Sequence, residues 1–171
     1  MSETDRIWDQ LQRTFEGGDA WRCPSLRDLQ AAVGAPQAAA RPIAAAPSIW
    51  ELLLHLTVYE NVARRRLGGE KVETLPDELG WPKPPDTSPS AWLRAKLDFG
   101  EARRALRQAV ASFPEARLGE TVPGREYTFY VMLHGAIEHA LYHAGQIEML
   151  MVAQGVRPSA APMSAHLSPR A

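Results

Sequence analysis

Several features that would assign this 171-residue sequence to a functional class are missing from it. It has a single cysteine, Cys23, so no disulfide can form within the chain and a reducing compartment is expected. It contains no run of about 18 apolar residues, the minimum for a transmembrane helix. The acidic start, Met-Ser-Glu-Thr-Asp, lacks the apolar segment of a signal peptide. We therefore expect a cytoplasmic protein with no membrane partner.

An excess of charge of one sign is also missing, since the formal net charge is −1. Nucleic-acid binding needs a basic surface, so we expect no nucleic-acid partner. Hydrophobic residues make up 45% of the chain and charged residues 23%, which is ordinary for a globular protein. This length suits one domain with a substantial core.

Helical periodicity dominates the sequence, and no segment alternates as a strand would. Ser48 and Glu51 form the pattern of a capping box, and Pro89 follows a serine that can begin a helix. Main helices are predicted at 4–16, 48–67, 88–111 and 127–154, with a short helix after Ser25. We predict an all-α four-helix bundle over residues 1–155, followed by an extended or disordered tail at 156–171.

Apolar spacing predicts the core-facing positions of the second and third main helices. In the second they are Ile49, Leu52, Leu53, Leu56, Tyr59 and either Val62 or Ala63; in the third they are Trp92, Leu93, Leu97, Ala105, Leu106 and Ala109. Residues 70–90 are rich in proline and have no clear period. A connection this long permits a crossover between helices, and long loops often cover functional sites or form their walls.

Histidines at positions 139 and 143 are the main functional signal. Residues four apart lie on one face of a helix, so the two imidazoles can reach one metal ion. His55 is the other histidine within a strong helical pattern, and it completes a candidate three-histidine site. His134 lies roughly 140° around the helix from His139, and His166 lies in the tail, so neither is expected to be a ligand.

Three neutral imidazoles suit Zn, Ni, Cu or Fe and leave a coordination position open, as in catalytic zinc sites. The alternative is a set of buried histidines that are satisfied by hydrogen bonds alone. Glu51 and Gln146 are candidate hydrogen-bond partners for the ligand rings, although capping competes for Glu51. Tyr59 and Tyr142 are candidate pocket residues, and Glu51 and Tyr59 are the candidate bases nearest His55.

Two further groups of residues have simpler interpretations. The tryptophans at 50, 81 and 92 are best explained as core and loop anchors. The arginines at 64–66 lie in the last turn of a helix, where cations favour the helix dipole. We interpret this run as a solvated helix end, with contact to an anionic substrate as the alternative.

The segments Ser48-Ile-Trp-Glu-Leu-Leu-Leu-His55-Leu and His139-Ala-Leu-Tyr-His143-Ala-Gly-Gln146-Ile resemble the DinB-like (damage-inducible, YfiT-like) superfamily, and the likeness extends over about residues 4–154. This resemblance implies an up-down-down-up bundle, a homodimer, and a zinc or nickel site formed by His55, His139 and His143. Some relatives are thiol S-transferases, and others are isomerases or metal-dependent hydrolases. Many relatives have an arginine after the second histidine of this motif, where this sequence has Ala144.

The leading hypothesis is therefore a metal-dependent enzyme acting on a small-molecule substrate, with thiol S-transfer from a low-molecular-weight thiol as its reaction. A bound divalent ion would lower the pKa of a thiol or of water. One alternative is a metal-dependent hydrolase. Another is a non-catalytic metal- or ligand-binding stress-response protein, in which the metal stabilises the bundle by joining two helices.

Overall fold

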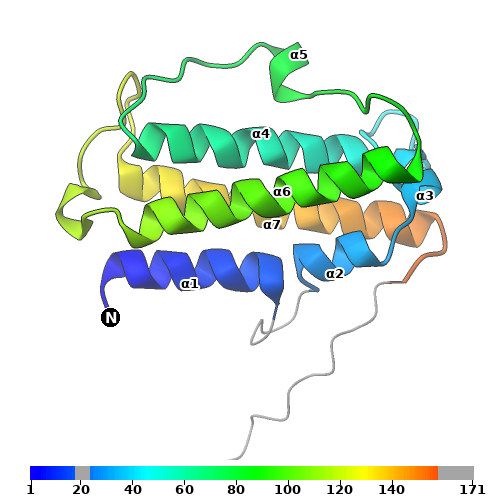
Figure 1. Ribbon diagram of the computed structural model, residues 1–171, viewed down its shortest axis with the longest axis horizontal. Coiled ribbons are helices and arrows are strands. Elements are labelled where there is room, and N and C mark those ends of the chain that lie inside the picture. Colours follow the sequence, from blue (N-terminus) through cyan, green and yellow to red (C-terminus); the bar gives the residue numbers. More distant parts are fainter. Residues whose placement is uncertain (18–23, 158–171) are drawn as a thin grey trace, which may run out of the picture.

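The computed structural model describes residues 1–17 and 24–157, which fold as helices joined by loops (Figure 1). The main helices are α1 (Glu3–Glu16), α4 (Ile49–Leu67), α6 (Pro89–Ala111) and α7 (Phe129–Ala153); the shorter ones are α2 (Leu26–Ala31), α3 (Ala35–Ala39), α5 (Asp77–Gly80) and the 3-10 turn η1 (Glu115–Arg117). Within the described residues, β pairing is limited to an isolated bridge between Thr121 and Thr128. The predicted all-α bundle is confirmed.

Short polar motifs determine where the long helices begin and end. Ser48 Oγ accepts the Glu51 N–H at 3.2 Å, and the Ser48 N–H donates to the Glu51 carboxylate at 2.8 Å, as the capping box predicts. Equivalent boxes begin α1 and α2. Gly17 and Gly155 follow the ends of α1 and α7 with φ values of 78° and 73°, a conformation that other residues rarely adopt.

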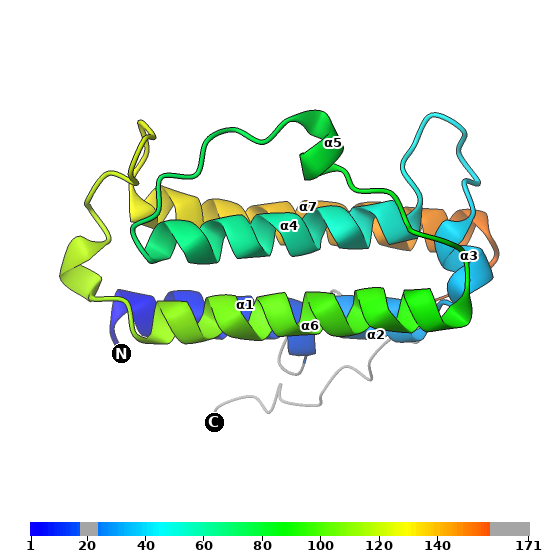
Figure 2. The same ribbon diagram turned by 45° about the horizontal axis from the view of Figure 1, so that its top comes forward.

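The helices run up-down-down-up along the chain (Figure 1). Helix α4 packs against α6 and α7, and α1 packs against the same two helices. Helices α1 and α2 lie end to end on one side of the bundle (Figure 2). Because α4 and α6 are parallel, the chain must return over the length of α4, about 28 Å. Residues 68–88 make this crossover, and they carry α5 over the α4–α7 side of the bundle (Figure 2).

The structure corrects three expectations about these elements. Leu93 and Leu97 are 53% and 59% exposed, because the core face of α6 follows Trp92 through Phe99 and Leu106 at helical spacing. Tyr59 is 36% exposed rather than a core residue. The long connection also contains the short helix α5, which sequence periodicity did not reveal.

Cys23 lies outside the described residues, as does the predicted tail from residue 158 onward, which includes His166. No helix in residues 1–17 and 24–157 combines the length and the apolar character that crossing a bilayer requires.

Candidate metal centre

Helices α4 and α7 bring three histidine side chains together. His55 lies on α4, and His139 and His143 lie on successive turns of α7. The Nε2 atom of His139 is 3.0 Å from that of His55 and 3.0 Å from that of His143. The candidate ligand atoms of all three rings lie within 4.8 Å of one another. The structure thus juxtaposes the three histidines that the sequence pattern selects.

Hydrogen bonds at the far side of two rings determine which nitrogen carries the proton. His55 Nδ1 lies 2.7 Å from the Gly80 carbonyl oxygen, and His143 Nδ1 lies 2.6 Å from Gln146 Oε1. Because these oxygens accept hydrogen bonds, both Nδ1 atoms must donate, and each Nε2 then holds a lone pair. This arrangement, with Nδ1 donating to an oxygen, is typical of metal-binding histidines.

The three Nε2 atoms fit a metal ion better than they fit one another. A proton on His139 Nε2 can form a linear hydrogen bond with only one of its two neighbours, which leaves the other facing it with a lone pair. Nitrogen ligands lie about 2.0–2.1 Å from zinc, so two ligands that subtend an angle of about 90–109° at the ion are separated by about 2.8–3.4 Å. The observed 3.0 Å separations agree with this range. The three residues can therefore hold a divalent transition metal.

Burial keeps the three imidazoles neutral near pH 7. It lowers the pKa of His139 to about 4, and the neighbouring His143 and His55 lower it further. Burial also lowers the pKa of His55 and of His143, opposed by their bonds to Gly80 and Gln146 respectively. A metal binds the neutral form of histidine, so these shifts favour metal binding.

Aromatic rings surround the centre. The Trp81 ring stacks on His55 at a centroid distance of 3.7 Å and an interplanar angle of 16°. Tyr59 lies 4.7 Å from the His55 ring and 5.3 Å from the His139 ring. Tyr142 approaches the edge of His143 at 5.1 Å but remains 65% exposed. Trp81 and Gly80 were not among the predicted site residues, because the crossover that carries them has no helical period.

Glu51 has a different environment from the one proposed on sequence grounds. Its buried carboxylate accepts hydrogen bonds from Arg41 at 2.5 Å, from Lys83 at 2.7 Å and from the Ser48 amide. Burial alone would raise the pKa of Glu51, but Lys83, Ser48 and Arg41 outweigh this effect and lower it to about 2. Glu51 thus holds Arg41 and Lys83 near the start of α4, while Gly80 accepts from His55.

His134 lies away from the three histidines. Its Nε2 is 3.7 Å from a carboxylate oxygen of Glu3, and its ring packs on Tyr130 at 4.4 Å. This placement agrees with the rotation that separated His134 from His139 on sequence grounds.

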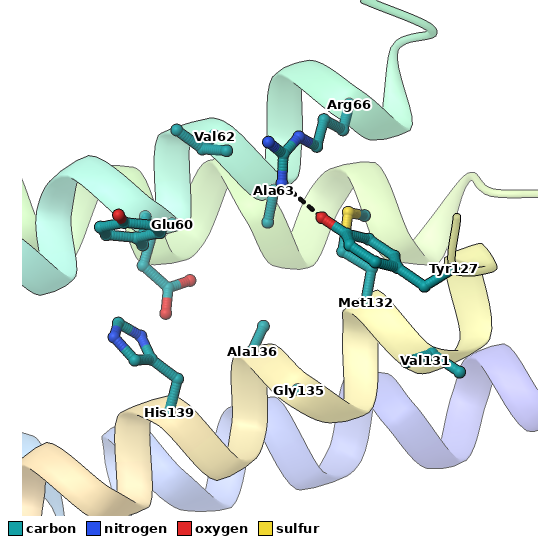
Figure 3. A pocket seen from close by; sticks show the side chains of 11 residues that line it. Glu60, Val62, Ala63, Arg66, Tyr127, Val131, Met132, Gly135, Ala136 and His139 are labelled. Atoms are coloured by element: carbon teal, nitrogen blue, oxygen red, sulfur yellow. Dashed lines mark hydrogen bonds between the residues drawn. The ribbon is translucent and has the colours of Figure 1, made fainter. Parts of the chain in front are cut away.

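A cavity of about 330 Å³ adjoins the three histidines between α4 and α7 (Figure 3). His139 and Tyr59 line it near the centre, and Arg66 and Tyr127 line it at the other end. Most of the remaining wall is apolar, including Met132. Its volume is at the lower end of the range for small-molecule sites.

A buried ion pair, Glu60–Arg103, lies beside this cavity. Arg103 is fully buried, and its guanidinium donates to Glu60 and to the Leu11 carbonyl. Burial raises the pKa of Glu60, and the charge of Arg103 opposes that rise. The Glu60 side chain extends from α4 toward α7 (Figure 3).

Fold and site together define a helical-bundle protein with a candidate three-histidine metal centre beside a small-molecule cavity. The model of the DinB superfamily matches residues 25–147, which include all three histidines and Gln146. The chain belongs to the DinB superfamily. No curated protein and no solved structure matches it.

Proposed function

We propose that this protein is a metal-dependent enzyme that transfers a low-molecular-weight thiol to an electrophilic small molecule. The observation that carries this proposal is the double role of His139. Its Nε2 is one of the three converging nitrogens, and its ring also lines the cavity. A group held at the histidines would therefore face a space that admits an organic substrate.

The residues of the chain have distinct parts in this proposal. The three imidazoles supply neutral nitrogen ligands, for which zinc or nickel is the expected ion. Such an ion, when bound, lowers the pKa of a thiol and keeps it as thiolate near neutral pH. Gly80 and Gln146 orient His55 and His143, while Trp81 and Tyr59 shield the rings from water. The cavity receives the electrophile, whose carbon forms a bond to sulfur as its leaving group departs with the bonding electrons.

Within residues 1–17 and 24–157, no carboxylate joins the three histidines in the cluster of candidate ligands, which favours thiol transfer over hydrolysis. Glu51 is paired with two cations, and Glu60 is paired with Arg103. A thiolate needs no base once it has ionised, whereas activation of water is aided by a nearby proton acceptor.

Metal content tests the first part of the proposal. We expect about one equivalent of zinc or nickel in purified, untagged protein, and none in the His139→Ala/His143→Ala variant. His134→Ala is the matched control, because it removes a histidine of α7 that lies outside the site. A wild-type protein that stays metal-free after incubation with zinc and nickel salts would refute the metal centre.

Turnover tests the second part. The wild-type protein is incubated with a panel of small thiols and a chromogenic aryl halide, with and without the metal. We expect halide release that requires thiol and metal together. Release without thiol would indicate the hydrolase instead, and a metal-loaded protein inactive with both would indicate the non-catalytic binding protein.

We also propose that the protein is a homodimer formed through the outer face of α7. Apolar side chains that are 45–65% exposed lie along this face, at Val131, Leu141, Tyr142, Met149 and Val152. Exposed apolar patches of this kind are typical of protein interfaces. Light scattering should give the mass of a dimer for the wild type and of a monomer for Met149→Glu; a wild-type monomer would refute this proposal.

A further inference from the structure

Arg66 differs from the two arginines that precede it on α4. Arg64 and Arg65 are exposed, and Arg65 pairs with Glu70. Arg66 is 9% exposed and donates from Nη1 to the Tyr127 hydroxyl at 2.7 Å and from Nη2 to the Val72 carbonyl at 2.8 Å. Its Nε has no hydrogen-bond partner. Its hydrogen-bond partners are therefore neutral, which is unusual for a buried cation.

A second cation lies beside the same carbonyl group. Arg125 donates to Val72 O at 2.7 Å and to Thr74 Oγ1 at 3.0 Å. Burial lowers the pKa of Arg66, and the charge of Arg125 contributes to the same effect. Across residues 1–17 and 24–157, the ion pairs of the structure give neither arginine a carboxylate, whereas the other buried arginine, Arg103, has Glu60. This end of the cavity therefore carries positive charge that the chain does not neutralise.

The position of Arg66 relates it to the histidines. Arg66 and Tyr127 line one end of the cavity, and His139, whose ring lies 5.3 Å from that of Tyr59, lines the other (Figure 3). Tyr59 and Arg66 are seven residues apart on α4, which corresponds to about 10 Å along the helix. The Tyr127 hydroxyl accepts from Arg66, so its own proton is free to donate to another group.

We propose that Arg66 and Tyr127 bind a carboxylate of the substrate, so that the enzyme acts on small molecules that carry a carboxylate at the end opposite the group held at the histidines. A guanidinium matches a carboxylate with two parallel hydrogen bonds, and the hydroxyl can supply a third. The wall between the two ends is mostly apolar and suits a hydrocarbon linker, and the charge of Glu60, which also lines the cavity, is paired with Arg103. This inference rests on the proposed function for the chemistry at the reacting end of the substrate. The carboxylate site itself does not depend on that chemistry.

Binding of hexanoate, compared with that of hexan-1-ol, tests the carboxylate site directly. Titrations of the full-length protein are followed by NMR at the Arg66 Nε–H, with and without one equivalent of zinc. We expect hexanoate to bind about tenfold more tightly than the alcohol, with or without zinc, because the hydrogen bonds are charge-assisted. Equal affinities, or a preference for hexanoate that appears only with zinc, would overturn the proposal.

Variants separate recognition from structural support. Arg66→Gln should abolish the preference for hexanoate, and Tyr127→Phe should reduce it severalfold. Arg65→Gln is the matched control, since it removes an exposed arginine of the same turn and should preserve the preference. If Arg66→Gln does not fold, Tyr127→Phe decides the question, because it retains the guanidinium. An unchanged preference in folded Arg66→Gln or in Tyr127→Phe would refute the assignment.

A bifunctional probe distinguishes failure of this site from failure of the proposed function. Mercaptohexanoate and mercaptohexanol are compared on cobalt-loaded protein, in which a coordinated thiolate gives a charge-transfer absorption band. Tighter binding of the acid, dependent on Arg66, would support both proposals. If neither thiol gives the band while the binding of hexanoate still depends on Arg66, the proposed thiol transfer is refuted and the carboxylate site is supported. If both thiols give the band with equal affinity, the carboxylate site is refuted and thiol binding at the histidines is supported.

Discussion

The bundle buries two polar clusters between its helices, and they differ in the charges that the chain places in them. Glu60 and Arg103 carry opposite charges, and Arg103 also donates to the Leu11 carbonyl. The three histidines instead direct neutral nitrogens at one point, with no cation from the chain between them. The charges of the first cluster are balanced within the protein, whereas the second can be completed by a ligand from outside.

This difference separates a structural polar cluster from a functional one without reference to burial. Arg103, His55 and His143 are all at most 5% exposed. The distinguishing property is the balance of charge inside the cluster, since Glu60 Oε2 and Arg103 Nε both lack hydrogen-bond partners among the described residues. By the same criterion, Arg66 resembles the histidines more than it resembles Arg103, because its charge has no counterpart.

Arg103→Met should have the largest effect on folding. It leaves the Glu60 carboxylate buried without its partner, which typically costs about 3–5 kcal/mol. Chemical denaturation measures the free energy of unfolding. The double variant Glu60→Gln/Arg103→Met should recover much of the loss, because no unpaired charge remains. If the double variant is as unstable as Arg103→Met, the loss of stability does not come from the unpaired charge of Glu60. The contrast between the ion pair and the three histidines would then fail.

Acidification should destabilise the metal-free protein through the histidines. The pKa of His139 is about 4 in the folded state against 6.5 for an unperturbed histidine. Between these values the unfolded chain binds more protons, so the free energy of unfolding decreases as the pH falls from 6.5 to about 4. This pKa difference corresponds to roughly 3 kcal/mol.

Denaturation curves recorded with a chelator at several pH values measure this dependence. His139→Gln should reduce the slope of stability against pH, leaving the share contributed by His55 and His143, whose pKa values are lowered as well. His134→Gln should retain the full slope. An unchanged slope in His139→Gln would place the acid sensitivity elsewhere.

Gln146→Ala should weaken metal binding without abolishing it. The change removes the oxygen that accepts the His143 Nδ1 proton, and loss of such a partner typically costs 10- to 100-fold in metal affinity, or about 1.4–2.7 kcal/mol. Competition with a chromogenic chelator measures the affinity. Gln154→Ala is the control, since Gln154, which caps the end of the same helix, donates to the backbone carbonyls of Leu150 and Gln37 and not to a histidine. Equal affinities for the two variants would show that Gln146 does not support His143.

The features that sequence alone could predict are those that depend on local periodicity. The bundle follows from apolar spacing and from capping residues such as Ser48, both of which act within a few residues. His139 and His143 were paired because one helical turn separates them. His55 was selected because its helix directs an apolar face inward. The sequence alone did not show that α4 and α7 are in contact.

The remaining parts of the site depend on the crossover. Gly80 lies 25 residues from His55, in a segment without a helical period, so its carbonyl could not be identified as the acceptor. Trp81 had the pattern of a loop anchor, and only the fold places its ring on His55. Arg66 belonged to a run of three arginines, and its burial depends on Val72, at the start of the crossover, and on Tyr127, which is 61 residues away.

Gly80→Ala should have the smallest effect, because the group that matters at this position is the backbone carbonyl. A methyl group added here would lie 3.4 Å from the Tyr59 hydroxyl, an ordinary contact. Gly80 ends α5 without a positive φ, so alanine needs no strained backbone and should change stability by less than about 1 kcal/mol. Metal affinity, measured by the same chelator competition, should stay within about twofold of the wild type, since the bond to His55 is retained. A loss as large as that expected for Gln146→Ala would mean that the crossover moves when its packing on Tyr59 changes. The His55 side of the centre would then depend on the position of the loop, and not on the hydrogen bond alone.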